Sequence, residues 1–312
     1  MTKRVVLIGH PVAHSLSGAM HQAAFDALGI NVRYELWDRP AIALAEAIET
    51  LRGDEFLGAN VTIPHKERVV PMVDRLTDDA QATGAVNTIT KDGRRLIGHN
   101  TDVPGFKAAL DRLVGRQKMP RQAVVLGAGG GARAVVYGLI TAGFQRVIVF
   151  NRHLHRAEAL VRHFARSAAH MELRAMPWHE SIIEAELAKT KVLVNATSVG
   201  LTDEHESPIP AEIIPPDLLV LDLIYNRTKL LRDAEAAGCT VMDGELMLLH
   251  QGAAAFTLWT GEEAPLEVMA AALREARATG LRSTEGEPAG AGSVGVEAGG
   301  ASGGPSEPDA SR

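Results

Sequence analysis

A glycine-rich turn near the middle of the chain leaves few choices of fold. The apolar run Ala123–Leu126 is predicted as a strand, and Gly-Ala-Gly-Gly-Gly-Ala follows it over residues 127–132. This is the G-x-G-x-x-A pattern that opens a helix after a strand in dinucleotide-binding folds. Gly127 allows a tight turn, Gly129 lets backbone amides approach a pyrophosphate, and small Ala132 lets the helix pack close to the strand. Because the helix N-terminus then faces an anion, the pattern favours dinucleotide binding over a purely structural turn.

The residues after the next strand indicate which dinucleotide is bound. Val147–Phe150 is the second predicted strand of this unit, and Asn151 and Arg152 follow it, with Arg156 close behind. An acidic side chain at this point would bind the ribose hydroxyls of NAD, whereas arginine pairs with the 2′-phosphate of NADP. The sequence therefore favours NADP, and the alternative is a solvated basic start of a helix.

Strand-like and helix-like runs alternate along most of the chain. Apolar patterns predict strands at residues 4–8, 32–37, 59–63, 85–90, 123–126, 147–150, 192–196 and 218–224, and helices at 18–28 and 41–51. Asp92-Gly93 lies between two strand-like runs and predicts a hairpin. Such alternation is typical of an α/β fold with a mostly parallel sheet covered by helices. The polar stretch Leu113–Gln122 reads as a link to a second unit.

The end of the chain divides into two helices and a tail. Residues 245–279 are predicted to form the helices, and Leu246, Leu249, Ala253 and Phe256 recur at a spacing that predicts one buried face. Met247 and Gln251, four residues apart, share another face. From residue 284 the sequence is rich in Gly, Ala, Ser, Pro and Glu, a composition that buries too little apolar surface to fold. We expect this tail to be disordered.

Composition excludes several classes of protein. The 312 residues are 46% hydrophobic and carry a net charge of −6, so we expect neither a nucleic-acid partner nor a polyanion-binding surface. Cys239 is the only cysteine, which fits a reducing compartment and a cytoplasmic protein. No apolar run approaches the length of a membrane span, so no membrane partner is expected.

Polar side chains gather where predicted strands end. Three sequence clusters carry them: Asn60, Thr62 and Lys66; Asn87 and Thr88; and Asn100, Thr101 and Asp102. Ligands of open α/β sheets bind outside the carboxyl ends of the strands. Each residue alone is more typical of a turn or a helix cap, but the three clusters together predict a site for a polar ligand.

The first strand also ends in polar residues. After Ile8 and Gly9 the chain continues through His14, Ser15 and Ser17 before a predicted helix begins. Packing does not require these side chains at a strand end, so they are candidates for ligand binding. We expect His14 to orient the turn rather than to take part in chemistry.

With these motifs in place, the chain resembles the shikimate dehydrogenase family. The resemblance runs from Val5 to Gly261 and rests on nine motifs in family order. These are GHPVAHSLS, NVTIPHK, GAVNT, GHNTDVPGF, GAGGGARA, NR, NATSVGL, DLIY and GELMLLHQGAAAF. One such match is weak, whereas nine in sequence are very specific.

The resemblance implies a fold, a reaction and a domain plan. It implies an N-terminal α/β substrate domain with a mostly parallel sheet, a Rossmann-like NADP-binding domain, and a cleft between them. The family reversibly reduces 3-dehydroshikimate to shikimate with NADPH, in aromatic amino-acid biosynthesis. We expect the substrate-binding catalytic domain at residues 1–105, the NADP-binding domain at 106–243, helices packing back on the substrate domain at 244–280, and a disordered tail at 281–312. The protein is expected to be a monomer or a homodimer.

The resemblance also implies roles for individual residues. Lys66 and Asp102 form the catalytic pair, and which of them transfers the proton is left open. The implied substrate-binding residues are Ser15, Ser17, Asn60, Thr62, Lys66, Asn87, Asp102, Tyr225 and Gln251. The implied cofactor-binding residues are Asp78, Gly127, Ala128, Gly129, Gly130, Gly131, Asn151, Arg152, Leu223 and Gly244. No metal site is implied.

Four positions depart from the family pattern. Gly18 stands where proline usually follows the second serine, His21 stands where asparagine is common, and Asn226 replaces a frequent proline after Tyr225. His153 replaces a threonine after Asn151 and Arg152, which removes a hydroxyl that would help to hold a 2′-phosphate. Two alternatives remain beside this interpretation: a quinate/shikimate dehydrogenase of broader specificity, and a non-catalytic shikimate-binding regulatory protein.

Overall fold

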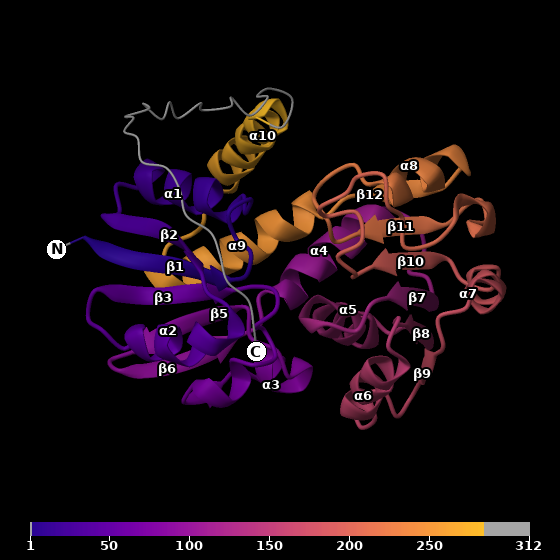
Figure 1. The fold of residues 1–312 in the computed structure, drawn as a ribbon, viewed down its shortest axis with the longest axis horizontal. Helices are drawn as coiled ribbons and strands as arrows, with labels where there is room; N and C mark the ends of the chain where they lie inside the picture. The colour runs from indigo at the N-terminus through magenta and orange to yellow at the C-terminus, as the bar shows by residue number, and fades with distance from the viewer. Residues whose placement is uncertain (1, 284–312) are drawn as a thin grey trace, which may run out of the picture.

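The computed structural model describes residues 2–283, which form two α/β units side by side (Figure 1). The first unit has a six-stranded sheet in the order β2-β1-β3-β5-β6-β4. Its strands are β1 (Lys3–Gly9), β2 (Val32–Asp38), β3 (Phe56–Val61), β4 (Arg75–Leu76), β5 (Thr88–Asp92) and β6 (Arg95–His99). Its helices are α1 (Ser17–Ala27), α2 (Leu44–Thr50) and α3 (Asp78–Thr83), with short 3₁₀ turns η1 (Ala41–Ala43) and η2 (Val70–Met72).

The first sheet is mixed, with parallel pairs in the majority. β1 pairs in parallel with β2 and β3, and β4 with β6, whereas β5 is antiparallel to β3 and β6. Strand β1 is a continuous apolar run because helices or other strands cover it on all sides. The predicted hairpin is confirmed, since Asp92 and Arg95 pair across the β5–β6 turn and Gly93 has a φ of +60°.

The second unit has a fully parallel sheet in the order β12-β11-β10-β7-β8-β9. Its strands are β7 (Gln122–Leu126), β8 (Arg146–Phe150), β9 (Glu172–Met176), β10 (Val192–Asn195), β11 (Leu219–Asp222) and β12 (Thr240–Met242). Its helices are α5 (Gly130–Thr141), α6 (Leu154–Phe164), α7 (Glu180–Leu187) and α8 (Lys229–Ala236), with the 3₁₀ turn η3 (Ala211–Ile213). The order reverses between β7 and β10, the position at which doubly wound sheets bind dinucleotides.

Two helices join the units. Figure 1 shows α4 (Asp102–Val114) and α9 (Glu245–Thr260) running between the two sheets. They cross closely, because a Cβ added at Gly105 of α4 would lie 2.7 Å from the carbonyl oxygen of Met247 in α9. The helix α4 also packs on α5, where Gly138 contacts Phe106. The predicted boundary at 105/106 therefore falls inside α4, and the link between the units is shorter than predicted, since α4 extends to Val114.

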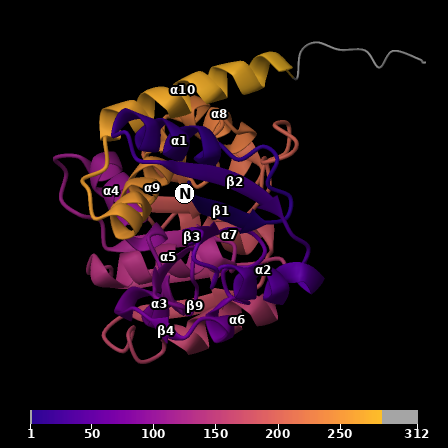
Figure 2. The ribbon, with the colours of Figure 1, turned by 90° about the vertical axis from the view of Figure 1, so that its left-hand side faces the viewer.

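The C-terminal helices return to the first unit. Ala255, Phe256 and Trp259 of α9 join the core that contains Val5 and Phe25. Helix α10 (Leu266–Ser283) lies along α1 (Figure 2). Residues 281–283 of the predicted tail thus belong to α10, and 284–312 lie outside the described residues. No helix within residues 2–283 is long and apolar enough to cross a membrane.

The predicted buried face of α9 was wrong. Of Leu246, Leu249, Ala253 and Phe256, only Phe256 is fully buried, and the other three are half-buried. The buried residues of α9 are Met247, Gln251, Gly252, Ala255, Phe256 and Trp259. The reason is that α9 contacts α4, α1 and the strands β3 and β5, so that apolar spacing alone does not single out one face.

Candidate active site

Lys66 and Asp102 form a close, largely buried ion pair. Lys66 lies in the loop after β3, and Asp102 is the first residue of α4, where the helix dipole favours a carboxylate. The Lys66 Nζ atom donates to Asp102 Oδ2 at 2.6 Å, and the two side chains are 16% and 5% exposed. The structure therefore brings the two predicted catalytic residues together from separate elements.

Asn87 holds the carboxylate from the other side. Its Nδ2 atom donates to Asp102 Oδ1 at 2.9 Å and to Thr101 Oγ1 at 2.9 Å, and its Oδ1 atom accepts from the Thr101 backbone amide at 2.7 Å. The same Nδ2 atom approaches Gln251 Oε1 at 3.3 Å. Because Asn87 and Gln251 are 164 positions apart, this contact shows how α9 completes the polar cluster.

Asn60 is part of a hydrogen-bonded layer beneath the pair. Its Nδ2 atom donates to the Asn87 carbonyl at 3.2 Å and to Thr88 Oγ1 at 3.1 Å, and its Oδ1 atom accepts from the Tyr34 hydroxyl at 2.7 Å. Burial raises the pKa of Tyr34, while a hydrogen bond with Ser17 opposes the rise. Sequence reasoning missed Tyr34, although an aromatic residue with a polar tip on an inward position of a strand was the available signal.

The serine turn after β1 is built differently from the expectation. Ser15 Oγ accepts from the backbone amide of Ser17 at 3.3 Å, so that Ser15 orients the turn. His14 is exposed and makes no side-chain hydrogen bond within the part of the chain described here. The expected orienting role of His14 therefore has no support from the geometry. Ser17 is buried at the start of α1, on the side that faces Tyr34.

Thr62 and Tyr225 approach the cleft from opposite units. Thr62 is half-buried just beyond β3, and a Cβ at Gly9 would lie 2.3 Å from its Cγ2 atom, so only glycine fits at the end of β1. Tyr225 is half-buried in the loop after β11, and burial raises its pKa. Neither side chain makes a hydrogen bond among residues 2–283, so both hydroxyls are available to a ligand.

The glycine-rich turn has the geometry that its sequence predicts. Gly127 has a φ of +107°, and a Cβ there would lie 2.7 Å from the Ala196 carbonyl oxygen. A Cβ on Gly129 would meet nothing within 4 Å, so the surface beside the helix N-terminus is open. Ala128 and Ala132 are buried in the core of this unit. An open helix N-terminus after a glycine-rich turn is a favourable place for a pyrophosphate.

The remaining loops bring Leu223 and Gly244 to the same turn. A Cβ at Gly131 would touch Leu223 Cδ1 at 3.4 Å, and one at Gly244 would lie 2.2 Å from the Leu223 carbonyl oxygen. Leu223, which makes both contacts, directly follows Asp222. The Asp222 carboxylate accepts hydrogen bonds from Asn195 Nδ2 and the Ile224 backbone amide. Burial raises the pKa of Asp222 to about 6. Asp222 therefore ties together the loops that follow β10 and β11.

The basic residues after β8 are exposed. Asn151 Nδ2 donates to the His153 carbonyl at 2.9 Å, which shapes the turn before α6. Arg152 in this turn and Arg156 in the first turn of α6 are both exposed, and Arg156 lies 3.9 Å from a Glu67 oxygen. Two exposed guanidinium groups beside the glycine-rich turn suit a phosphate ester on the adenosine ribose.

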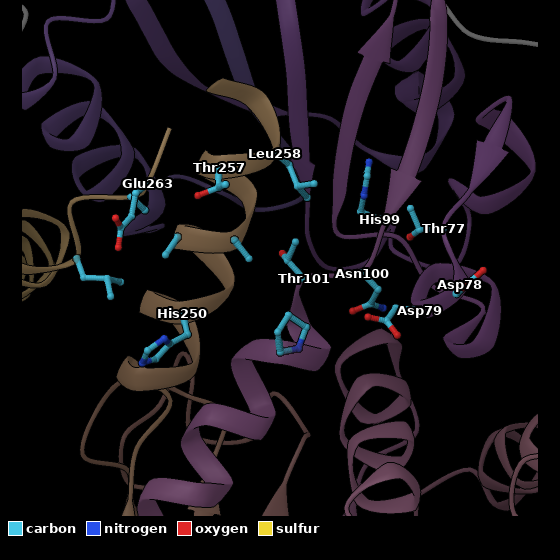
Figure 3. A pocket seen from close by; sticks show the side chains of 15 residues that line it. Thr77, Asp78, Asp79, His99, Asn100, Thr101, His250, Thr257, Leu258 and Glu263 are labelled. Atoms are coloured by element: carbon cyan, nitrogen blue, oxygen red, sulfur yellow. The ribbon is translucent and has the colours of Figure 1, made fainter. Parts of the chain in front are cut away.

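Asp78 lies elsewhere in the structure. It is in the first turn of α3 and lines a groove of about 830 Å³ between α3 and α9 (Figure 3). Asn100 and Thr101 also line this groove, whereas Lys66 and Asp102 do not. Within residues 2–283 no hydrogen bond or ion pair joins Asp78 to the glycine-rich turn. Its expected position near the nicotinamide stays a prediction.

Three family models match consecutive parts of the chain. Residues 7–89 match the shikimate dehydrogenase substrate binding domain, and residues 111–206 match shikimate / quinate 5-dehydrogenase. Residues 244–274 match the shikimate 5′-dehydrogenase C-terminal domain. The order of these matches follows the first unit, the second unit and the returning helix α9.

Whole proteins and solved structures agree with these matches. A protein from Methanopyrus kandleri named shikimate dehydrogenase (NADP(+)) is 44% identical over 278 residues, which cover 88% of this chain and 96% of that protein. The Thermus thermophilus shikimate 5-dehydrogenase, solved in complex with NADP(H) and shikimate, is 42% identical with a TM-score of 0.76, over 88% of this chain and 99% of that one. A quinate dehydrogenase from Corynebacterium glutamicum, solved with NAD, is 31% identical with a TM-score of 0.78, over 88% of this chain and 99% of that one. The chain therefore belongs to the shikimate dehydrogenase family.

Proposed function

We propose that the chain is an NADP-dependent oxidoreductase that reversibly reduces 3-dehydroshikimate to shikimate, in the route to aromatic amino acids. The observation that carries the proposal is the Lys66–Asp102 pair, 2.6 Å apart and close to the glycine-rich turn. Hydride transfer leaves the protein with one hydroxyl proton to manage and two reactants to align. A buried amine and carboxylate at the edge of a dinucleotide-binding turn meet both requirements.

The polar cluster matches a substrate with several hydroxyls and one carboxylate. Ser15 lies in the turn between β1 and α1 and Ser17 is the first residue of α1, and their hydroxyl groups can bind a carboxylate without placing a full positive charge there. Thr62 offers a hydroxyl and Gln251 an amide from two other elements, and Asn87, whose amide bonds Thr101 and Asp102, lies between them and the carboxylate of Asp102. Asn60 is already satisfied by protein partners, so we assign it to shaping the site rather than to direct recognition.

The catalytic pair is arranged to hold and move a proton. Lys66 Nζ is a donor held by Asp102 Oδ2, and Asn87 fixes the second carboxylate oxygen. A substrate hydroxyl placed beside Nζ would lie within one hydrogen bond of both groups. Either member of the pair is in a position to transfer the proton, and the other then stabilises the charge that remains.

NADP fits the second unit on the evidence of the chain's own geometry. The turn at Gly127–Gly131 would hold the pyrophosphate, and Leu223 and Gly244 would flank the nicotinamide end. Arg152 and Arg156 would bind the 2′-phosphate. When bound, the cofactor supplies or accepts the hydride. Tyr225, in the loop after β11, would line the space between the cofactor and the substrate.

A matrix of substrates and cofactors tests the proposal. Purified protein is mixed with shikimate or quinate, each with NADP⁺ or NAD⁺, and the absorbance of the reduced cofactor is followed. We expect the highest kcat/KM with shikimate and NADP⁺. Higher kcat/KM with quinate and NAD⁺ would assign the chain to the broader-specificity branch. Binding of shikimate with no turnover would favour a regulatory protein and contradict the proposal.

A further inference from the structure

The Lys66 loop is docked directly on the second unit. A Cβ added to Gly130, the first residue of α5, would lie 2.8 Å from Lys66 Cβ and 3.2 Å from its Cδ. The aliphatic stem of Lys66 therefore rests on the glycine-rich turn, although Lys66 itself belongs to the first unit. The distance between Lys66 and anything bound at that turn depends on how firmly this loop is held.

Arg133 joins the residue after Lys66 to the end of α3. It lies in the first turn of α5, and its side chain is 14% exposed. The Nε atom donates to Glu67 Oε2 at 3.0 Å, and the Nη1 atom donates to the Thr83 carbonyl at 2.9 Å. Glu67 is the neighbour of Lys66 in sequence. The segment after Thr83 is also hydrogen-bonded to the Lys66 loop, because the Val86 backbone amide donates to the Lys66 carbonyl at 2.8 Å.

The local geometry favours this one arrangement. The Thr83 carbonyl is at the C-terminal end of α3, where a cation is stabilised. Gly84 follows it with a φ of +61°, and a Cβ there would lie 3.0 Å from Arg133 Nη1 and 2.8 Å from His163. His163, in α6, makes a further contact of 2.8 Å with the Ala82 carbonyl. Two cationic or polar groups of the second unit thus bind the end of one helix of the first.

The position of Arg133 in its own helix is locally unfavourable. A cation in the first turn of a helix opposes the helix dipole, which favours anions there. Its guanidinium gains instead from Glu67, a carboxylate of the other unit, and from a geometry that places two donors on two acceptors. Because α5 gains nothing from the charge, the contact between the units is what explains the residue.

We propose that Arg133 is a positioning residue for Lys66: by binding Glu67 and the Thr83 carbonyl, it fixes Lys66 against the glycine-rich turn. This rests on the proposed function, in which Lys66 handles the proton and the turn binds the hydride carrier. Displacing a reacting group by about 1 Å costs roughly a hundredfold in rate, so a loosened loop lowers kcat. Most of the substrate-binding residues belong to the first unit or to α9, so shikimate affinity in the absence of NADP is unaffected.

The test compares Arg133→Gln and Arg133→Lys with the wild-type protein and with Arg146→Gln. Arg146 is a matched control in the same unit, 19% exposed and paired with Glu172 and Glu186 inside that unit. Three quantities are measured: kcat for shikimate oxidation, the Kd of shikimate without cofactor, and amide hydrogen exchange over residues 62–69. A fourth variant, Glu67→Ala, removes the partner from the other side.

For Arg133→Gln we expect kcat to fall by roughly tenfold to a hundredfold, an unchanged shikimate Kd, and faster exchange over residues 62–69. Arg133→Lys should recover part of the kcat, because lysine keeps the positive charge but lacks the planar guanidinium group that donates to two acceptors at once. Combining Glu67→Ala with Arg133→Gln should cost little more than Arg133→Gln alone, since without Arg133 the Glu67 carboxylate retains only its 3.9 Å contact with the exposed Arg156. Arg146→Gln should lower only the melting temperature.

Two results overturn the inference. If Arg133→Gln keeps kcat within about twofold of a fully active wild-type protein, Arg133 does not position Lys66. If its shikimate Kd rises as much as kcat falls, Arg133 supports the first unit as a whole. A wild-type protein that does not oxidise shikimate is a different result, which contradicts the proposed function and removes the catalytic role of Arg133 with it.

Discussion

His21 is a fully buried histidine beneath the candidate substrate site. Its ring stacks on Tyr34 with centroids 4.8 Å apart, and neither ring nitrogen has a hydrogen-bond partner in residues 2–283. Burial lowers the pKa of His21 from its ordinary value near 6.5 to about 3. The native protein therefore keeps this ring neutral at a pH where the unfolded chain binds a proton.

His21 should make the protein sensitive to acid. Its folded pKa is depressed, so the contribution of His21 to the free energy of unfolding is greatest above about pH 6.5 and falls by up to about 1.4 kcal/mol per pH unit below it. His21→Phe keeps an aromatic ring against Tyr34 but does not titrate, so its stability should change less between pH 6.5 and 4. Urea unfolding at several pH values measures this, with the exposed His14→Gln as control. Equal slopes in wild type and His21→Phe would contradict the account.

Arg152 should discriminate between the two dinucleotides. Arg152→Ala is expected to weaken NADP far more than NAD, because a charge-assisted hydrogen bond to the 2′-phosphate contributes about 1.5–3 kcal/mol, or roughly tenfold to a hundredfold in affinity. Isothermal titration with each cofactor measures the two losses. Equal losses would mean that Arg152 supports only the turn, and that Arg156 binds the phosphate.

Side chains differ in how far the sequence reveals them. Lys66, Asn87 and Asp102 were predictable because each lies in a short, recognisable motif next to a strand. Tyr34 and Arg133 were not, since each acts through a partner far away in the sequence: Asn60 for the first and Glu67 for the second. A cation in the first turn of α5 was the one local signal for Arg133.

The crossing of α4 and α9 determines how the two units meet. Gly105 faces the Met247 carbonyl and the Gln251 backbone, and there is no space for a methyl group between the helices. The same helices carry Asp102 and Gln251 into the site. Close packing at this crossing is therefore coupled to the distance between Asn87, Asp102 and Gln251.

Gly105→Ala should destabilise the protein. The added Cβ would lie 2.7 Å from backbone, and overpacking of this kind costs about 1–3 kcal/mol. Gly18→Ala, also in the first turn of a helix, is the matched control, because its Cβ would meet Leu36 at an ordinary 3.6 Å. Thermal unfolding should show a lower Tm for Gly105→Ala only. A Tm unchanged in both variants would mean that the helices separate at no cost.

Elements with strong apolar runs were predicted well, and the others were not. The strands β1, β7, β8 and β10 are buried on both faces and stand out in the sequence. Strands β9 and β12 were missed: one is at a sheet edge with Glu172 and Arg174 in it, and the other has only three residues. Edge position and short length remove the continuous apolar pattern on which such predictions depend.

The order of the motifs predicted the overall architecture. Apolar spacing did not predict that α9 packs back on the first unit. The second unit and the parallel-rich sheets were expected from strand and helix alternation, whereas the reversal of strand order between β7 and β10 was not predicted. Helix α9 contacts both units, so its burial pattern is spread around the helix. The contact between Gln251 and Asn87 depended on the family resemblance rather than on periodicity.

Truncation should show that turnover does not need the C-terminal tail but does need helices α9 and α10. A chain that ends at residue 283 should retain its turnover, because every predicted site residue precedes that point. A chain that ends at residue 243 lacks α9 and α10, which complete the core around Phe25 and supply Gln251, so it should not bind shikimate. Assays of turnover and of shikimate binding distinguish the two fragments. Loss of turnover on removing only residues 284–312 would contradict this division.

The kcat of shikimate oxidation by Lys66→Ala, Asp102→Ala and the double variant tests the account most directly. Each single variant should lose roughly a hundredfold to ten-thousandfold in kcat while still binding NADP, because the pair lies outside the groups that would hold the cofactor. The double variant should lose much less than the product of the two, since the residues are 2.6 Å apart and act as one unit. A single variant with near wild-type kcat, or losses that multiply, would contradict it.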